Sequence, residues 1–222
     1  MSIDHSGRRE LYWTPAQFAA LRDDEAFWYL LALCRAVNAI KAAQVQAIGS
    51  RDSTSPGASR QRIAGFFNLA ATLFEALEFS KRLGKHFKSL ASFSGVAALH
   101  RNKQILTLTS EILEPIRNTV VFHFDLDVMP RSRLTLAPDN FTFARWDYDD
   151  VESGIYYDLA DLAALHTVLG SPASPEQFFD RIEVFLSGVI SAARQFSKAA
   201  EDLIQEYVTG VGIEERAESG DP

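Results

Sequence analysis

The chain has 222 residues, of which 47% are hydrophobic and 23% are charged, a composition typical of a soluble globular domain. A chain of this length can bury a core of its own, so we expect no structural metal, and one cysteine excludes an intrachain disulfide. The net charge of −7 argues against an extended basic surface for duplex DNA. The start MSIDHSGRRE has no apolar secretion signal, and no uncharged apolar run approaches the roughly 18 residues that span a bilayer. We therefore expect a cytoplasmic protein with no membrane contact.

The first part of the chain predicts three helices. Thr14-Pro15 favours a short helix that ends near Arg22, because threonine caps a helix and proline suits its first position. Apolar residues then recur at helical spacing over 24–48 and over 59–83, and a polar loop separates the two ranges. The expected apolar stripes are Phe27, Leu30, Leu31, Cys34, Val37, Val45 and Ile48, and Ile63, Phe66, Phe67, Ala70, Leu73, Phe74 and Leu77. Two such helices form an antiparallel hairpin that needs further helices to cover it.

The remainder of the chain predicts the rest of a bundle. We expect a short helix over 95–100, a fourth helix over 103–114 that Pro115 interrupts or restarts, and a short helix that ends at Gly170. Ser174-Pro175 caps a long last helix, which we expect to pack on the first hairpin. Its near-heptad stripe is Phe178, Ile182, Phe185, Val189, Phe196, Leu203 and Tyr207.

One segment differs from the helical pattern. Apolar residues flank the turn Pro138-Asp139-Asn140, which predicts a two-stranded hairpin, and Ile155 to Leu159 is a candidate third strand. The expected fold class is therefore mainly α, an antiparallel helical bundle with a small β-hairpin insertion. We predict one helical-bundle domain over 1–210, with the insertion at about 131–159 and a disordered acidic tail over 211–222.

The segment PIRNTVVFH, residues 115–123, places a cation, an amide and an imidazole among apolar residues. One interpretation is purely structural, with Arg117 paired to Asp125 or Asp127 and His123 at the boundary of the core. The other interpretation is chemical, because arginine binds phosphate, histidine titrates near neutral pH and asparagine can orient either partner. Such a set suits phosphoryl transfer on RNA without a metal.

The order of these residues, Arg117-Asn118, four further residues and His123, resembles the R-x4–6-H motif of the HEPN superfamily. The resemblance implies a bundle of four to five helices that forms a homodimer, with the motifs of two protomers in one cleft. Active members cut RNA without a metal, often in toxin–antitoxin or defence settings, whereas other members are non-catalytic binding or dimerisation modules. The resemblance gives Arg117 the role of phosphate-binding cation, Asn118 that of orienting residue and His123 that of general base or acid.

Other clusters have weaker chemical interpretations. His123, Asp125 and Asp127 would share one face of an extended segment and offer metal ligands, although a solvated strand face is the more common outcome. Residues 100–103, with Arg60 and Arg62, are candidates for a basic pocket, and ordinary solvated helix ends are the alternative. We expect Glu75 and Glu78 to form salt bridges at the edge of an apolar face. The aromatic residues of FTFARWDYDD and IYYD would either stack bases or cover the end of the bundle.

From the sequence we therefore expect a HEPN-like, metal-independent endoribonuclease or RNA-binding protein that acts as a homodimer. Its candidate catalytic residues are Arg117, Asn118 and His123, with no cofactor and with RNA and an antitoxin or other protein as partners. The alternative is a non-catalytic helical module that dimerises or binds a protein.

Overall fold

The computed structural model describes residues 9–48, 56–121, 145–147, 154–156 and 163–217, apart from positions 167, 171, 173 and 213. These residues are mainly helical, which confirms the predicted fold class at this level. The α-helices are α1 (Pro15–Leu21), α2 (Glu25–Ile48), α3 (Pro56–Ser80), α4 (Gly84–Phe87), α5 (Phe93–Leu99), α6 (Lys103–Leu108) and α8 (Pro175–Gly210). Two π-helical segments, η1 (Thr109–Leu113) and η2 (Ile116–Val121), continue α6, and residues 163–166 and 168 are also helical.

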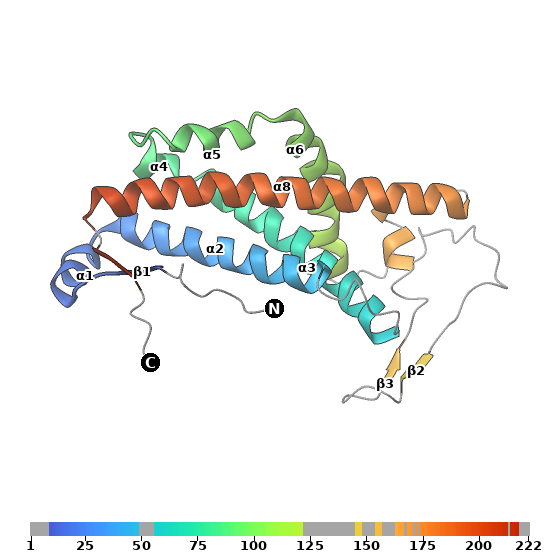
Figure 1. The fold of residues 1–222 in the computed structure, drawn as a ribbon. Helices are drawn as coiled ribbons and strands as arrows, with labels where there is room; N and C mark the ends of the chain where they lie inside the picture. The colour runs from blue at the N-terminus through green and yellow to red at the C-terminus, as the bar shows by residue number, and fades with distance from the viewer. Residues whose placement is uncertain are drawn as a thin grey trace.

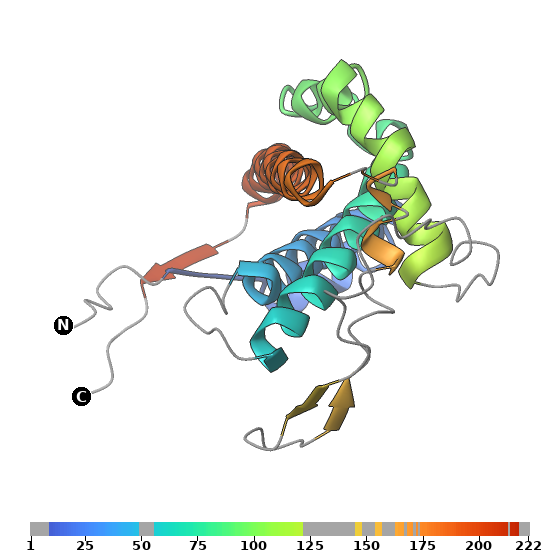
Figure 2. The same ribbon diagram turned by 90° about the vertical axis from the view of Figure 1, so that its right-hand side faces the viewer.

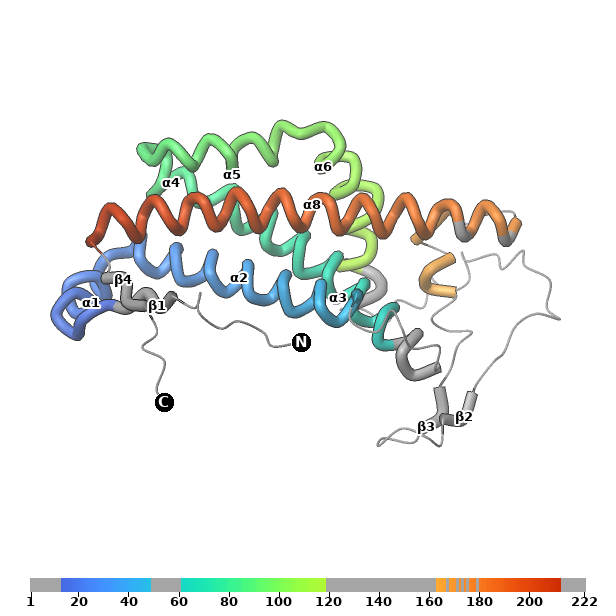
Figure 3. Tube along the Cα trace, viewed as in Figure 1, coloured from blue at the N-terminus to red at the C-terminus, as the bar shows by residue number. Residues whose placement is uncertain are grey.

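The long helix α8 runs along the molecule and organises the bundle (Figure 1). It packs on α2 along one side and on α5 along another, and α3 packs against α2, α8, η1 and η2. In Figure 2, which looks along α8, the segment from α6 to η2 runs steeply down one side of the bundle, beside α3. The trace in Figure 3 shows α2 and α8 side by side over the length of α2. As predicted, the last helix packs on the α2–α3 hairpin.

The core between these helices is one hydrophobic cluster with members from α2 to α8. The predicted stripe of α8 is correct, because Phe178, Phe185, Val189, Phe196 and Leu203 are all buried. The predicted stripe of α2 is correct only in its first half. Ile40 and Ala43 are buried further along α2, whereas Val45 is 70% exposed. A regular helix of 3.6 residues per turn carries position 45 away from the face that holds positions 40 and 43.

Helix ends follow the local sequence closely. Thr14 caps α1 in a reciprocal capping box with Gln17, and Pro15 occupies the first position of α1, as predicted. The side chain of Ser174 accepts a hydrogen bond from the main chain of Gln177 at the start of α8. Gly170 has a positive φ of 72°, which glycine adopts without strain and which ends the helical residues before it.

Pro115 neither stops the helix nor restarts a separate one. Proline lacks a main-chain N–H and its ring collides with the carbonyl four residues earlier, so an α-helical pattern is costly around it. The chain widens into π-helical turns on both sides of Glu114-Pro115 and continues in the same direction. The hydroxyl of Thr109 also donates to the Ile105 carbonyl at 2.7 Å, at the point where the α-helical pattern ends.

The strands differ from the predictions. Strand β1 (Arg9–Tyr12) pairs antiparallel with β4 (Glu214–Ala217), a pairing that the sequence did not predict. The disorder expected for the acidic tail over 211–222 stays a prediction. A strand can form there because main-chain hydrogen bonds hold it and do not require apolar side chains. Strand β2 (Arg145–Asp147) pairs with β3 (Gly154–Tyr156). The predicted hairpin around Pro138–Asn140 is not supported, since its turn lies outside the described residues.

Among the described residues, two helices have the length and composition of a membrane span, namely α2 and the stretch Gln61–Ser80 of α3. The buried share of their most apolar windows is 33% and 56%, and a core helix of a soluble protein satisfies the same criteria. The only cysteine, Cys34, is half-buried on α2, and burial raises the pKa of its thiol. A raised pKa disfavours the nucleophilic thiolate, in agreement with the structural role that its apolar surroundings predict.

Candidate functional site

Arg117 projects from η2, the π-helical segment that packs on α3. The neighbouring Ile116 is completely buried and fixes the main chain of η2 against the core. The side chain of Arg117 itself is 37% exposed, so its cation reaches the surface from a rigid support. A π-helical turn at such a position is notable because π-bulges in helices are frequent at functional sites.

Two polar side chains hold the Arg117 guanidinium. Its Nε donates to Glu75 Oε1 on α3 at 2.7 Å, and its Nη1 donates to Asn118 Oδ1 at 3.0 Å. An ion pair of Arg117 with Asp125 or Asp127 stays a prediction, because both aspartates lie outside the described residues. Glu75 reaches Arg117 because η2 packs along α3, a relationship that local sequence does not reveal.

The three candidate catalytic residues are therefore described in part. Arg117 and Asn118 are in direct contact through one hydrogen bond, and the orienting role of Asn118 stays a prediction. His123 lies outside the described residues, so its place beside Arg117 stays a prediction. Sequence reasoning assigned no chemical role to Glu75, whose position at the edge of an apolar helical face was the only signal available.

The two glutamates at this edge of α3 have different partners. Glu75 reaches across to η2, whereas Glu78 forms an ion pair with Lys81, the residue directly after the end of α3. Both therefore form salt bridges at the edge of the apolar face, as predicted. Leu73, Ala76 and Leu77 surround Glu75 in sequence and are buried, so the main chain that carries the carboxylate is firmly anchored.

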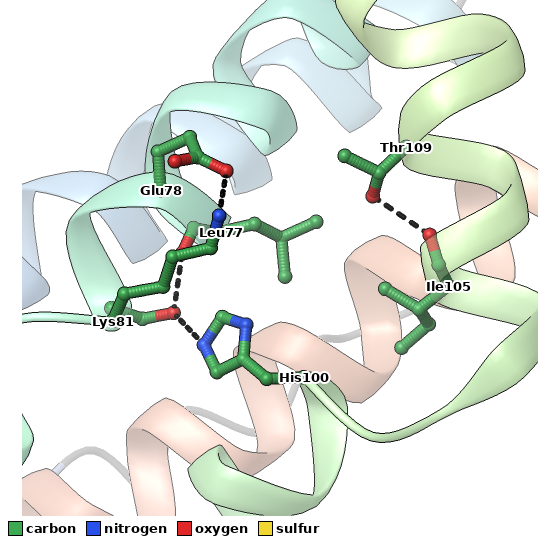
Figure 4. Close-up of polar contacts among 7 residues, drawn as sticks. Leu77, Glu78, Lys81, His100, Ile105 and Thr109 are labelled. Carbon is green, nitrogen blue, oxygen red and sulfur yellow. Dashed lines mark hydrogen bonds and ion pairs between the residues drawn. The ribbon is translucent and has the colours of Figure 1, made fainter.

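Two of residues 100–103, His100 and Asn102, make structural contacts. His100 Nε2 lies 2.9 Å from the hydroxyl oxygen of Ser80 (Figure 4). The Ser80 hydroxyl uses its own hydrogen to donate to the Leu77 carbonyl. His100 must therefore carry a proton on Nε2 and donate it to the Ser80 oxygen. Burial, assisted by the charge of Lys81, lowers the pKa of His100. Asn102 caps α6 through the main-chain nitrogen of Gln104. Among the basic candidates, the side chain of Arg60 lies outside the description and Arg62 is half-buried.

A second histidine, His166, is completely buried and was not singled out by the sequence. Its ring stacks on Phe178 with centroids 6.3 Å apart, and within the part of the chain that the structure describes neither ring nitrogen has a hydrogen-bond partner. The surrounding sequence AALHTVL gave no signal beyond a histidine in an apolar helical run. The stacked rings pack the short helical segment of residues 163–166 against α8.

An open groove of about 1110 Å³ lies between α8 and the segment formed by α6 and η1. Leu108 and Ile112 line it on one side, Val184 and Phe185 on the other, and several polar side chains surround these apolar residues. Val184 is 73% exposed, which is unusual for an aliphatic side chain of this size. The groove can therefore accept an apolar partner surface.

Within the part of the chain that the structure describes, no group of three or more histidine, cysteine, aspartate or glutamate side chains forms a metal site. The predicted alternative ligands His123, Asp125 and Asp127 lie outside that part. Comparison of the chain with protein-family models, curated proteins and solved structures finds no match. The function proposed below therefore follows from the chemistry and geometry of Arg117, Asn118 and their contacts.

Proposed function

We propose that the protein is a HEPN-like, metal-independent endoribonuclease that acts as a homodimer, with Arg117, Asn118 and His123 at its centre. The observation that carries the proposal is the Arg117 guanidinium, which is partly exposed and oriented by Glu75 and Asn118. A pre-oriented guanidinium matches the geometry of a phosphate group better than a flexible cation does. The R-x4–6-H resemblance supplies the histidine partner.

The reaction that suits these groups is attack of a ribose 2′-oxygen on the adjacent phosphorus. His123 would accept the proton of the 2′-hydroxyl, and the bond from phosphorus to the 5′-oxygen would break. A proton from water then reaches that 5′-oxygen and completes the cleavage, and the products carry a 2′,3′-cyclic phosphate and a 5′-hydroxyl. Arg117 would stabilise the charge that builds on the phosphate oxygens. In the proposed homodimer, two copies of the motif line one cleft. We further propose that the protein acts in a toxin–antitoxin or defence setting, with an antitoxin as its protein partner.

A labelled RNA pool, incubated in EDTA with the wild-type protein, tests this function. We expect cutting by the wild type, loss of cutting in Arg117→Ala and His123→Ala, and wild-type cutting in Arg35→Ala, whose exposed arginine lies on α2. Cyclic phosphate ends on the products identify the reaction. Absence of cutting and of RNA binding by a folded wild-type dimer contradicts the proposal.

The second candidate is a non-catalytic module that dimerises or binds a protein. The groove between α6–η1 and α8 favours it, because Val184 in the groove and Leu106 on α6 are large apolar side chains that are at least half exposed. Sedimentation of the wild type and of Val184→Asp at several concentrations tests this role. A wild type that fails to cut RNA, together with an association lost in Val184→Asp, selects the module over the nuclease.

A further inference from the structure

We propose that Glu75 is a positioning residue of the ribonuclease site, which sets the orientation in which Arg117 meets the phosphate of an RNA substrate. This inference rests on the proposed function and adds to it a residue outside the R-x4–6-H motif. The Nε–H of Arg117 points at Glu75 Oε1 over 2.7 Å, a length typical of a strong charge-assisted hydrogen bond. The contact joins residues 42 positions apart in sequence and two different helices.

Both ends of this contact are held rigidly by the core. On α3 the neighbours of Glu75 in the buried face include Leu73 and Ala76, and on η2 the buried Ile116 precedes Arg117 directly. The main chain that carries each of the two side chains therefore has little freedom to move, and the hydrogen bond joins two firmly anchored segments. Asn118 fixes a second nitrogen of the same guanidinium at 3.0 Å. Two contacts to one planar group define the orientation of its plane.

A purely stabilising role explains this pair less well. The side chain of Arg117 is 37% exposed and that of Glu75 is 51% exposed. Ion pairs this accessible to water contribute about 0–1 kcal/mol to stability, because water and salt screen them. Orientation of a reacting group has a far larger effect, since a misplacement of about 1 Å costs on the order of a hundredfold in rate. Loss of Glu75 should therefore affect catalysis much more than folding.

The nearby Glu78 provides a matched control. It lies one turn further along α3, is also partly exposed, and pairs with Lys81 of the same chain segment rather than with η2. Glu78→Ala removes a carboxylate from the same helix and leaves the contacts of Arg117 with Glu75 and Asn118 intact. Any general effect of lowering the negative charge of α3 will appear in both alanine variants.

The test compares wild type, Glu75→Ala, Glu75→Gln and Glu78→Ala. Cleavage rates at saturating RNA are measured in EDTA, and affinity is measured for a 2′-deoxy version of the best-cut sequence, which cannot react. We expect Glu75→Ala to cut on the order of tenfold to a hundredfold more slowly. Its affinity for the deoxy oligonucleotide should fall much less, because orientation matters most in the transition state. Glu75→Gln keeps an acceptor oxygen for Arg117 Nε and should restore most of the rate, and Glu78→Ala should match the wild type.

Each result has a defined meaning. Wild-type rates in Glu75→Ala overturn the positioning role and leave the ribonuclease in place. A Glu75→Gln variant as slow as Glu75→Ala also overturns it, because the negative charge and not the hydrogen bond would then be required. A folded wild type that neither cuts nor binds RNA overturns the proposed function and this inference together. The ¹H–¹⁵N signal of Arg117 Nε, sharp in wild type and Glu75→Gln but broadened in Glu75→Ala, checks the orientation directly.

Discussion

The carboxylate of Glu206 on α8 caps the chain at Ser92, directly before α5. Its Oε2 accepts hydrogen bonds from the main-chain nitrogen of Ser92 at 2.8 Å and from the Ser92 hydroxyl, and its Oε1 accepts one from the nitrogen of Ala91 at 3.0 Å. One side chain thus satisfies two main-chain donors on a segment 114 residues earlier in the sequence. This contact attaches the α4–α5 segment to the long helix.

Replacement of Glu206 by glutamine should lower the melting temperature at neutral pH. Hydrogen bonds from the Ser92 hydroxyl, the Ser92 nitrogen and the Ala91 nitrogen lower the pKa of Glu206 from its ordinary value of 4.5. The folded state therefore favours the ionised carboxylate, so this stabilisation is complete above pH 4.5 and is lost as the pH falls through the lower folded value. Thermal melts of both proteins from pH 7 to pH 2 should converge at the acid end.

Glu183→Gln, an exposed position on the same helix, should follow the wild type throughout. A constant difference at all pH values would contradict the assignment.

Gly65 allows α3 to approach α2 closely. A Cβ at this position would lie 2.7 Å from the Ala47 nitrogen and 2.8 Å from the Gln46 carbonyl carbon, both of them main-chain atoms that cannot rotate away. We expect Gly65→Ala to destabilise the protein by about 1–3 kcal/mol in urea unfolding, the usual cost of overpacking. Gly210→Ala is the control, because a Cβ there meets nothing within 4 Å. It should be neutral or slightly stabilising, since alanine favours a helix more than glycine does. Equal stability of both variants would show that the helices separate freely at Gly65.

Leu113 and Leu106 lie on the same continuous helical run but in opposite environments. Leu113 in η1 is fully buried, whereas Leu106 in α6 is 50% exposed. Leu113→Ala should lower the free energy of unfolding by about 2–5 kcal/mol, because it leaves a cavity in the core. Leu106→Ala should change it by about 0.5 kcal/mol or less. Similar losses in the two variants would mean that the π-helical turns do not direct Leu113 into the core.

His100 should titrate below 6.5, its ordinary pKa, in an NMR titration of its ring protons. Burial is the main cause and the charge of Lys81 adds to it, while Glu78 acts in the opposite direction. As the pH falls below 6.5 the unfolded chain takes up this proton first, so stability decreases until the folded protein is protonated as well. Lys81→Met should raise the pKa of His100, because it removes the cation and leaves Glu78. Lys41→Met is the control, since Lys41 pairs with Glu201 instead. A pKa of His100 at or above 6.5 in the wild type would contradict the effect of burial.

Much of the helical framework follows from local sequence. Thr14 and Ser174 cap their helices because a side-chain oxygen can reach the exposed main-chain nitrogens of the first turn, a contact within three residues. The apolar stripe of α8 is equally readable, since a helical period repeats along one segment. The sequence predicts that Pro115 disturbs the helix. It does not predict the π-helical turns around Pro115, because their formation depends on how η2 packs on α3.

Contacts between distant segments were decided by the tertiary structure alone. The sequence singled out Arg117 and Asn118 through their chemistry and spacing, and it placed Glu75 at the edge of a helical face. It could not pair Arg117 with Glu75 or Glu206 with Ser92, because those pairs depend on the relative rotation of packed helices. Rotation of one helix by a single position, about 100°, would turn either carboxylate away from its partner without changing the local sequence pattern. The sequence therefore determined which side chains stand at these positions, and the packing of α3 against η2 brought the carboxylate of Glu75 to Arg117.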